Sequence, residues 1–505
     1  MTINETEWIA GLEKREPKLY PYLLMMLVTI LGSVYLRRTR RMEAMISKIP
    51  GPPTLPIIGN IHLFFGADIK GLINIQDELF KTYGTILRVW IGPHLWINLA
   101  EPKYIHALLS SEHGTNKDSS SQFFKSQSDG IFIASGKKWK TLRKIINPTF
   151  HQKILESYLI TFNEKSDILV KQLDKKVDEP IFDIGDYTAK CTLDFLCGTL
   201  MGVKSGVQYE KHNNFSKNVT ESIKIIQQRF YKLHYQPEWV FRFSKISKQL
   251  IALVEPALDF AKQVILERVK IREEEDSDYQ VHDRKGRSIY LDTVLDNFKH
   301  MSLDELTTLT LDTFIAATDT TRVATAYTFL LLGAHPDIQE RVYQEIIEVV
   351  GDGEFTIYNL TALMYLDMVL KEVLRLFSVP MVTRELGRDL DVDDLTLPSG
   401  SCILVSFNAL HHDPKFWKHP DEFHPDHFLP EEVSKRPKYS YLPFGYGPRN
   451  CPGHAFAMLS MKTMIGSVIR KYRILSKFDM QNAEYEYIFM QELKNGYPVQ
   501  LMKRI

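Results

Sequence analysis

Residues 444–453 read Phe-Gly-Tyr-Gly-Pro-Arg-Asn-Cys-Pro-Gly, and this stretch decides the fold. Gly445 and Gly447 remove side chains where a flat group must approach the backbone closely. Pro452 suits the first position of a helix, and an apolar helical pattern comes after it. The free amides and the dipole at a helix N-terminus stabilise an anion and lower the pKa of a thiol. The stretch therefore predicts a thiolate at Cys451 beneath a loop that a flat group can approach.

A heme iron takes such a thiolate as its axial ligand. The pattern Phe-x-x-Gly-x-Arg-x-Cys-x-Gly resembles the heme-binding signature of the cytochrome P450 family of heme-thiolate monooxygenases. This resemblance implies that Cys451 ligates the iron of a heme b and that Phe444, Arg449 and Gly453 belong to the heme site. The alternative is a structural cysteine, the usual fate of a lone buried cysteine. Three further motifs favour the heme.

Trp139 and Arg143 are four residues apart, so they share one face of a helix. An indole N–H beside a guanidinium can hold a carboxylate. The pair is similar to the family's Trp-x-x-x-Arg, which binds a heme propionate, and the resemblance adds Arg449 and Arg384 to that site. Alternatively, Arg143 lies on the surface over an aromatic ring.

Glu372 and Arg375 are three residues apart among Leu, Val and Phe side chains, which favours a buried ion pair on one helix face. The pair resembles the family's structural Glu-x-x-Arg. The family's third partner is an arginine, and this chain has His427 there, whose charge depends on pH. A solvated helix pair is the alternative reading.

Residues 316–321 read Ala-Ala-Thr-Asp-Thr-Thr within a long predicted helix. Small residues let a helix pass close over a flat ring, and Asp319 beside Thr320 offers a proton relay. The segment resembles the family's oxygen-side motif, with Ala317 where glycine is usual. Many members of the fatty-acid ω-hydroxylase clan carry a heme-esterifying glutamate where this chain has Ala316, so we expect a non-covalent heme. A Thr/Ala packing face is the alternative.

The N-terminal region divides into zones. Residues 19–36 are almost wholly apolar, and the next five residues include four arginines. About 20 apolar residues span a bilayer, and the positive-inside rule places the chain after these arginines in the cytosol. We expect a luminal segment (1–18), a transmembrane anchor (19–36), a basic and proline-rich hinge (37–60) and a heme-binding catalytic domain (61–505). A cleaved signal peptide, a mitochondrial presequence and a buried core helix are less favoured alternatives.

Composition sets the broad class. The chain has 505 residues, 44% hydrophobic and 25% charged, with zero formal net charge, which is typical of a globular protein and argues against a nucleic-acid binder. Its four cysteines form no CxxC pair, which suits a reducing compartment. Long helical periodicities at 251–272 and 303–332, with short strands near 85–99, predict a mainly α fold with small β-sheets. The resemblance supplies the packing, a cytochrome P450 fold preceded by a transmembrane helix.

The predicted function is insertion of one atom of O2 into a lipophilic substrate, whether fatty acid, hydrocarbon, hormone-like lipid or xenobiotic. By resemblance the electrons come from NADPH–cytochrome reductase, with cytochrome b5 a second candidate, at the endoplasmic reticulum membrane. Residues 130–151 resemble the ω-hydroxylase clan and its insect relatives. The candidate pocket segments are 115–135, 200–245, 378–384 and 485–496. Two alternatives remain: a heme-thiolate isomerase or dehydratase that uses no O2, and a non-catalytic heme-binding protein.

Overall fold

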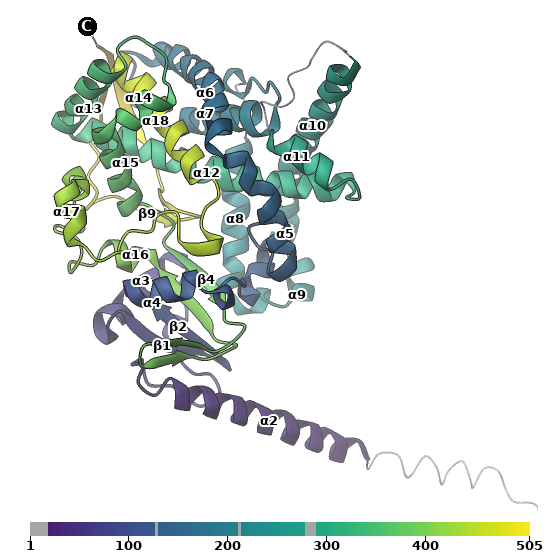
Figure 1. Ribbon diagram of the computed structural model, residues 1–505. Coiled ribbons are helices and arrows are strands. Elements are labelled where there is room, and N and C mark those ends of the chain that lie inside the picture. The colour runs from purple at the N-terminus through teal and green to yellow at the C-terminus, as the bar shows by residue number, and fades with distance from the viewer. Residues whose placement is uncertain (1–18, 127–129, 211–213, 278–288, 505) are drawn as a thin grey trace, which may run out of the picture.

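The computed structural model of this chain describes residues 19–126, 130–210, 214–277 and 289–504. Helices make up most of this part of the chain, and small sheets lie among and beside them (Figure 1). The predicted fold class, mainly α with small β-sheets, is confirmed.

Seventeen α-helices and eleven strands are assigned in the described ranges. The helices are α2 (Leu19–Met45), α3 (Ile69–Tyr83), α4 (Pro102–Ser110), α5 (Gly136–Ile146), α6 (Gln152–Leu173), α7 (Gly185–Leu196), α8 (Phe215–Tyr231), α9 (Glu238–Arg242), α10 (Lys245–Ser277), α11 (Tyr290–Asn297), α12 (Leu303–Ala334), α13 (Pro336–Val349), α14 (Ile357–Ala362), α15 (Met364–Leu376), α16 (Phe407–His411), α17 (Pro430–Lys435) and α18 (His454–Lys471). The strands are β1 (Ile86–Ile91), β2 (His94–Leu99), β3 (Phe182–Asp183), β4 (Met381–Glu385), β5 (Leu390–Val392), β6 (Leu395–Leu397), β7 (Cys402–Ser406), β8 (Tyr472–Leu475), β9 (Tyr485–Tyr487), β10 (Gln491–Leu493) and β11 (Pro498–Lys503).

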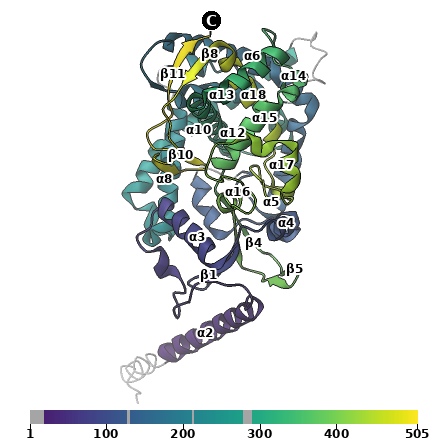
Figure 2. The ribbon, with the colours of Figure 1, turned by 90° about the vertical axis from the view of Figure 1, so that its left-hand side faces the viewer.

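The largest sheet has four strands in the order β1-β2-β7-β4. β1 and β2 form an antiparallel hairpin, β7 runs parallel to β2, and β4 pairs antiparallel with β7 so that Arg384 lies opposite Ile403. This sheet lies at the end of the molecule from which α2 projects, whereas β8 and β11 lie at the opposite end (Figure 2). The sheet therefore brings Arg384 into the same layer as the N-terminal strands.

Helix α12 runs through the middle of the body and packs against α7, α10 and α18. Its side chains are buried almost all round in the C-terminal half, as a helix surrounded by others requires. It begins at a capping box, in which the Ser302 hydroxyl and the Glu305 carboxylate each accept the backbone N–H of the other residue. The predicted helix at 303–332 is thus confirmed to within two residues of its end, and the one at 251–272 lies inside α10.

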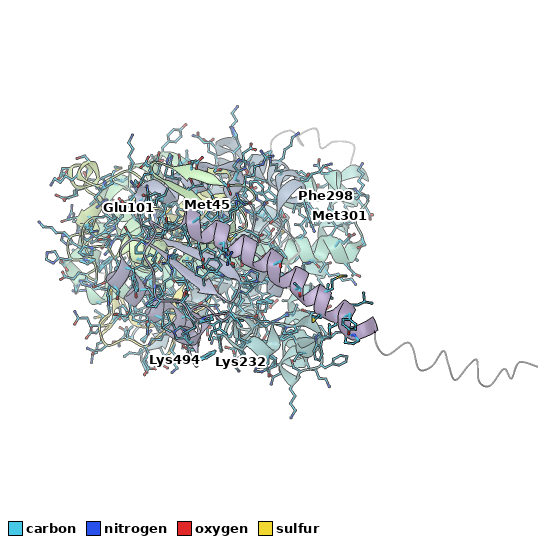
Figure 3. The ribbon with its side chains drawn as sticks, turned by 90° about the horizontal axis from the view of Figure 1, so that it is seen from below. Met45, Glu101, Lys232, Phe298, Met301 and Lys494 are labelled. Atoms are coloured by element: carbon cyan, nitrogen blue, oxygen red, sulfur yellow. The ribbon has the colours of Figure 1, made fainter. Side chains whose placement is uncertain are left out.

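Helix α2 begins at Leu19, where the predicted anchor begins, and continues past Leu36 to Met45. The arginines after Leu36 are good helix formers, and no proline or glycine interrupts the chain between Leu36 and Pro50. Met45 lies at the end of the helix that meets the body (Figure 3), and the rest of the helix runs away from the body below the sheet (Figure 1). Within the described ranges, no helix combines the length and the apolar content that crossing a bilayer requires. The predicted luminal segment, 1–18, lies outside the described residues.

The predicted hinge, residues 37–60, packs against the body of the protein. Its first part continues α2, and its proline-rich part packs along β1, where the Arg88 N–H donates to the Pro50 carbonyl at 2.8 Å. Gly59 has a φ of +62°, and a Cβ atom there would lie 2.4 Å from the Trp90 carbonyl oxygen. Proline stiffness and this close backbone approach hold the segment against β1, the edge strand of the sheet.

Candidate heme site

Cys451 lies in the loop between a 3₁₀ turn (Gly447–Arg449) and α18. Its N–H donates to the Phe444 carbonyl at 2.8 Å, which closes the loop, and its side chain is half-buried. Helix α18 begins at His454, so the prediction that Pro452 is its first residue is wrong. Burial raises the pKa of the Cys451 thiol, against the opposing effects of the Gly453 N–H and the Arg143 charge. Burial thus outweighs the loop amides that were predicted to lower this pKa.

The two glycines of the loop adopt backbone conformations that other residues rarely adopt. Gly447 has a φ of +71°, and a Cβ atom there would lie 1.8 Å from the carbonyl oxygen of Leu109 in α4. Gly445 has a φ of +69°, and a Cβ atom there would meet only Asn450 Cα among the described residues, at 3.9 Å. Gly447 thus allows the loop to pack against the end of α4, and both glycines supply left-handed backbone. The packing role of Gly447 was not predicted, and room for a flat group at this loop stays a prediction.

Arg449 points into the protein and is held by carbonyl oxygens alone. Its guanidinium donates to Thr115 O at 2.7 Å, Ala134 O at 2.7 Å and Ile131 O at 3.1 Å. It also lies 4.9 Å from the centre of the buried Trp139 ring. Burial, with the nearby charges of Arg384 and Arg143, lowers the pKa of Arg449 to about 9.

Arg143 and Arg384 approach the same place from α5 and β4. Arg143 donates to Asn450 O at 2.8 Å and to Asn450 Oδ1 at 2.5 Å, which ties α5 to the cysteine loop. Arg384 donates to the carbonyl of Thr383 at 2.7 Å, but its Nε is buried without a partner among the described residues. Burial lowers the pKa of Arg384 to about 10.

Lys117 joins these arginines, and sequence reasoning missed it as a cation of the site. Burial lowers its pKa well below the usual range, and the charges of Arg384 and Arg449 lower it further. Nothing in the local sequence, Asn-Lys-Asp, distinguishes this lysine from a surface residue. We call Lys117, Arg143, Arg384 and Arg449 the cation cluster.

The cation cluster has no counter-charge from the described residues in contact with it, although the charge of Asp118 acts on Lys117 and Arg384, and that of Asp312 on Lys117. Among the described residues, none of its four side chains forms an ion pair with a carboxylate. Buried charge without a partner costs free energy, and the unpaired Nε of Arg384 adds to that cost. A flat group bearing carboxylates, lying against the Cys451 loop, would satisfy these donors. The residues present therefore fit a heme.

Helix α12 presents Ala316 and Thr320 to a cavity of about 900 Å³. The Thr320 hydroxyl donates to Ala316 O at 2.9 Å. Asp319 points elsewhere: it is buried, and its carboxylate accepts from Arg322 Nη2 at 2.7 Å. The predicted acid–hydroxyl pair is thus divided between two faces, because consecutive helical residues are about 100° apart.

Arg322 bridges two carboxylates, and we call Asp319, Arg322 and Glu492 the Arg322 network. Its Nη2 also donates to Glu492 Oε2 at 2.7 Å. Burial, against the Arg322 charge and together with that of Asp319, raises the pKa of Glu492 to about 7. Asp319 Oδ2 and Glu492 Oε1 are buried without partners in the part of the chain described. The network is only half satisfied.

The predicted structural triad does come together, and we call Glu372, Arg375 and His427 the Glu372 network. Arg375 donates from Nε and Nη2 to the two oxygens of Glu372 at 2.9 and 2.8 Å. His427 Nδ1 lies 3.1 Å from Glu372 Oε1, and its Nε2 faces the Lys418 carbonyl. Both ring nitrogens therefore meet acceptor oxygens. Burial would raise the pKa of Glu372, but the hydrogen bonds from Arg375 and His427 outweigh it and the pKa is lowered.

Arg375 also holds the segment that leads to His427. It donates to His411 O at 2.9 Å, Pro420 O at 2.6 Å and Glu422 O at 3.0 Å. Arg436, a residue the sequence reasoning did not mark, donates to the carbonyl of His427 at 2.6 Å. The network thus joins α15 to the irregular chain that precedes the cysteine loop.

The cavity beside α12 draws on parts of all four predicted pocket segments. Its walls also contain a large contribution that was not predicted: one face of α3 and the inner residues of β1, β2 and β7. Five phenylalanines on the wall pack edge to face or stacked, with neighbouring ring centres 5.3–6.2 Å apart. They are Phe123, Phe124, Phe132, Phe230 and Phe489. The wall is therefore rigid and apolar.

Comparisons with known proteins agree with this geometry. The family model described as Cytochrome P450 matches residues 49–498. Cytochrome P450 4c3 of Drosophila melanogaster is 34% identical over 475 residues, which cover 88% of this chain and 89% of that protein. Cytochrome P450 4g1 of the same organism is 29% identical over 529 residues, covering 95% and 94%. Cytochrome P450 4V2 of Mus musculus is 31% identical over 440 residues, covering 83% and 82%.

Proposed function

This chain belongs to the cytochrome P450 family, and from that premise we propose that it is a membrane-associated monooxygenase of lipophilic substrates, with Cys451 as its iron ligand. The family's members bind heme b through a cysteine thiolate and are oxidoreductases that incorporate molecular oxygen. What remains to be assigned is which residues of this chain do what, and on which substrate.

The cation cluster is the observation that carries the assignment. Arg143, Trp139 and Arg449, whose guanidinium lies over the Trp139 ring, would hold one heme carboxylate, and Arg384 with Lys117 the other. Bound there, the heme supplies the activation of O2. The Phe444 carbonyl fixes the Cys451 backbone, and the Gly453 N–H donates to the sulfur, so the loop presents the thiolate in one orientation.

The residues that could supply protons to the site lie on α12. Thr320 faces the cavity and can pass a proton from its hydroxyl while it accepts another. Asp319 reaches Thr320 only when its ion pair with Arg322 opens. Ala316 offers no carboxylate for an ester bond, so the heme is held without a covalent link. Heme released intact by acid–acetone extraction is the expected result, and heme retained on denatured protein would contradict it.

The apolar face around α2 supports attachment to a membrane. The first turns of α2 expose large apolar side chains, and so do the proline-rich segment and α9 at the same end of the molecule (Figure 1). Ile57 is 81% exposed, Trp239 72% and Phe243 83%. The cavity wall includes Phe65 and Leu233 from this end, so a lipophile could enter from the bilayer. We place the protein on the endoplasmic reticulum membrane, anchored once by residues 19–36.

The orientation has its own test. Residues 4–6 read Asn-Glu-Thr, a glycosylation sequon in the segment that the anchor would place in the lumen. A glycosidase-sensitive mass on Asn4 is the expected outcome for microsomal protein. A glycan on Asn214 or Asn218, which belong to the catalytic domain, would overturn the topology.

We assign α5 as the surface on which the electron donor docks. Lys137, Lys138, Lys140 and Lys144 are exposed on this helix, whose buried face carries Trp139. A basic surface next to the Cys451 loop would steer an acidic donor, and we propose NADPH–cytochrome reductase, with cytochrome b5 as a second donor.

Reconstitution tests the reaction. The protein with reductase, NADPH and O2 is expected to hydroxylate a lipophilic substrate, with one oxygen-18 atom from labelled O2 in the product. Product formed equally without O2 or NADPH would favour the isomerase or dehydratase, and a bound heme without turnover would favour the non-catalytic protein.

A further inference from the structure

The wall of the cavity is poor in positive charge. The acidic and basic side chains on it, within the described residues, are three carboxyl groups, one lysine and one exposed histidine: Asp118, Asp312, Glu385, Lys117 and His94. Lys117 belongs to the cation cluster, where the heme carboxylates would engage it. A free carboxylate on a substrate would therefore meet three acidic side chains and, apart from the exposed His94, no basic side chain of the described residues outside the cation cluster. Burying an unpaired anion is costly, so this wall disfavours fatty acids in their ionised form.

Helix α3 adds one polar group to an otherwise apolar face. Ile69, Leu72, Ile73, Gln76 and Leu79 line the cavity, spaced so that they share one side of the helix. Gln76 is 7% exposed, and its Nε2 is buried with no partner in the described part of the chain. Among the cavity-lining side chains of those residues, it is the only one with such a buried, unpaired polar atom.

A nearby amide provides the contrast. Gln227 also lines the cavity, but its Nε2 already donates to Ile488 O at 2.8 Å, so this nitrogen has a partner within the chain. An unpaired buried donor is costly in the free protein and becomes favourable when a ligand supplies an acceptor. Gln76 is therefore a built site for an oxygen atom.

We propose that the substrate is a neutral oxygenated lipid: an apolar chain or ring system whose ester, ketone, ether or hydroxyl oxygen accepts a hydrogen bond from Gln76 Nε2. This deepens the proposed function and rests on it. α3 packs against β1, α8 and β9, whereas Ala316 and Thr320 come from α12, so the two walls are built by different elements. Gln76 holds the oxygen, and a carbon of the apolar part lies against Ala316 and Thr320.

Equilibrium dialysis of the heme-loaded protein with three probes of matched length tests the proposal: methyl dodecanoate, dodecanoic acid at neutral pH, and tridecane. In the unchanged protein the ester is expected to bind about tenfold more tightly than the ionised acid. Gln76→Leu is expected to weaken the ester about tenfold relative to tridecane, since it removes one donor and keeps the volume. Leu72→Ala, one turn away on the same face, is the control and should weaken both by the same factor.

The proposal is overturned if the acid binds as tightly as the ester, or if Gln76→Leu leaves the ester-to-tridecane ratio unchanged. Gln76→Glu asks the same question if the leucine variant does not fold, because a carboxylate accepts but cannot donate. The carbon monoxide spectrum of each preparation separates the two levels. If the spectrum is of the thiolate type but the ester is not preferred, only this inference is contradicted. If the thiolate-type spectrum is absent, the proposed function is contradicted.

Discussion

The cation cluster and the Glu372 network are both buried sets of charges, but they differ in how their charges are met. In the Glu372 network, every charged group has a partner within the chain: two bonds join Arg375 to Glu372, and three carbonyls take the remaining donors. In the cation cluster, the positive groups face carbonyls and one another, the nearby Asp118 carboxylate forms no contact ion pair with them, and Arg384 Nε has no hydrogen-bond partner among the described residues. Charges that the chain satisfies hold the fold, whereas charges that it leaves unmet mark the place of a ligand.

Removing charge from the satisfied network should have the largest effect. Glu372→Gln leaves Arg375 buried without its anion, which is expected to lower the free energy of unfolding by about 3–5 kcal/mol. Urea unfolding measures it, and Lys371→Gln on the exposed side of the same helix is the control, with an expected change below about 1 kcal/mol. A loss no larger than the control's would remove the distinction between the two regions.

The same network predicts behaviour in acid. Because the folded-state pKa of Glu372 is lowered, its stabilisation is complete above the ordinary glutamate value and is lost as the pH falls through the lowered value.

The Arg322 network is intermediate between these two regions, because only some of its buried polar atoms have partners. Since the folded-state pKa of Glu492 is raised to about 7, the folded protein binds a proton more readily than the unfolded chain. Stability should therefore fall as the pH rises from about 4.5 to above 7, by on the order of 1–3 kcal/mol. Unfolding curves of Glu492→Gln against the unchanged protein test this, because the variant should lose that slope. An unaltered slope would show that Glu492 does not titrate there.

Removing charge from the unmet cluster should have the smallest effect on the fold. Arg384→Met is expected to leave the unfolding free energy of the heme-free chain within about 1 kcal/mol, or to raise it, because no buried partner is orphaned. Its heme should dissociate about tenfold faster, the loss of one charge-assisted pair. Transfer of heme to an apoglobin acceptor measures that rate. A strongly destabilised apoprotein with unchanged heme release would place Arg384 with the structural charges.

The sequence predicted well what depends on local spacing. Glu372 and Arg375 share a helix face by their separation alone, and Trp139 and Arg143 do so in the same way. It could not predict how helices are rotated against their neighbours, so it gave no sign that α12 turns Thr320 toward the cavity and Asp319 toward Arg322. Lys117 and the α3 wall were missed because long-range pairing alone brings these segments to the site.

Local pattern also misled at the cysteine loop. Pro452 was expected to open the helix, but the chain makes a turn first and α18 begins at His454. The thiol pKa depends mainly on burial, which no sequence window reports.

The most direct test is the absorption spectrum of the reduced protein under carbon monoxide, recorded for the unchanged chain and for Cys451→Ala. A red-shifted Soret band of thiolate coordination in the first, lost in the second, is the expected result. Absence of that band in the unchanged protein, or its persistence in Cys451→Ala, would contradict the assignment of Cys451 as the iron ligand.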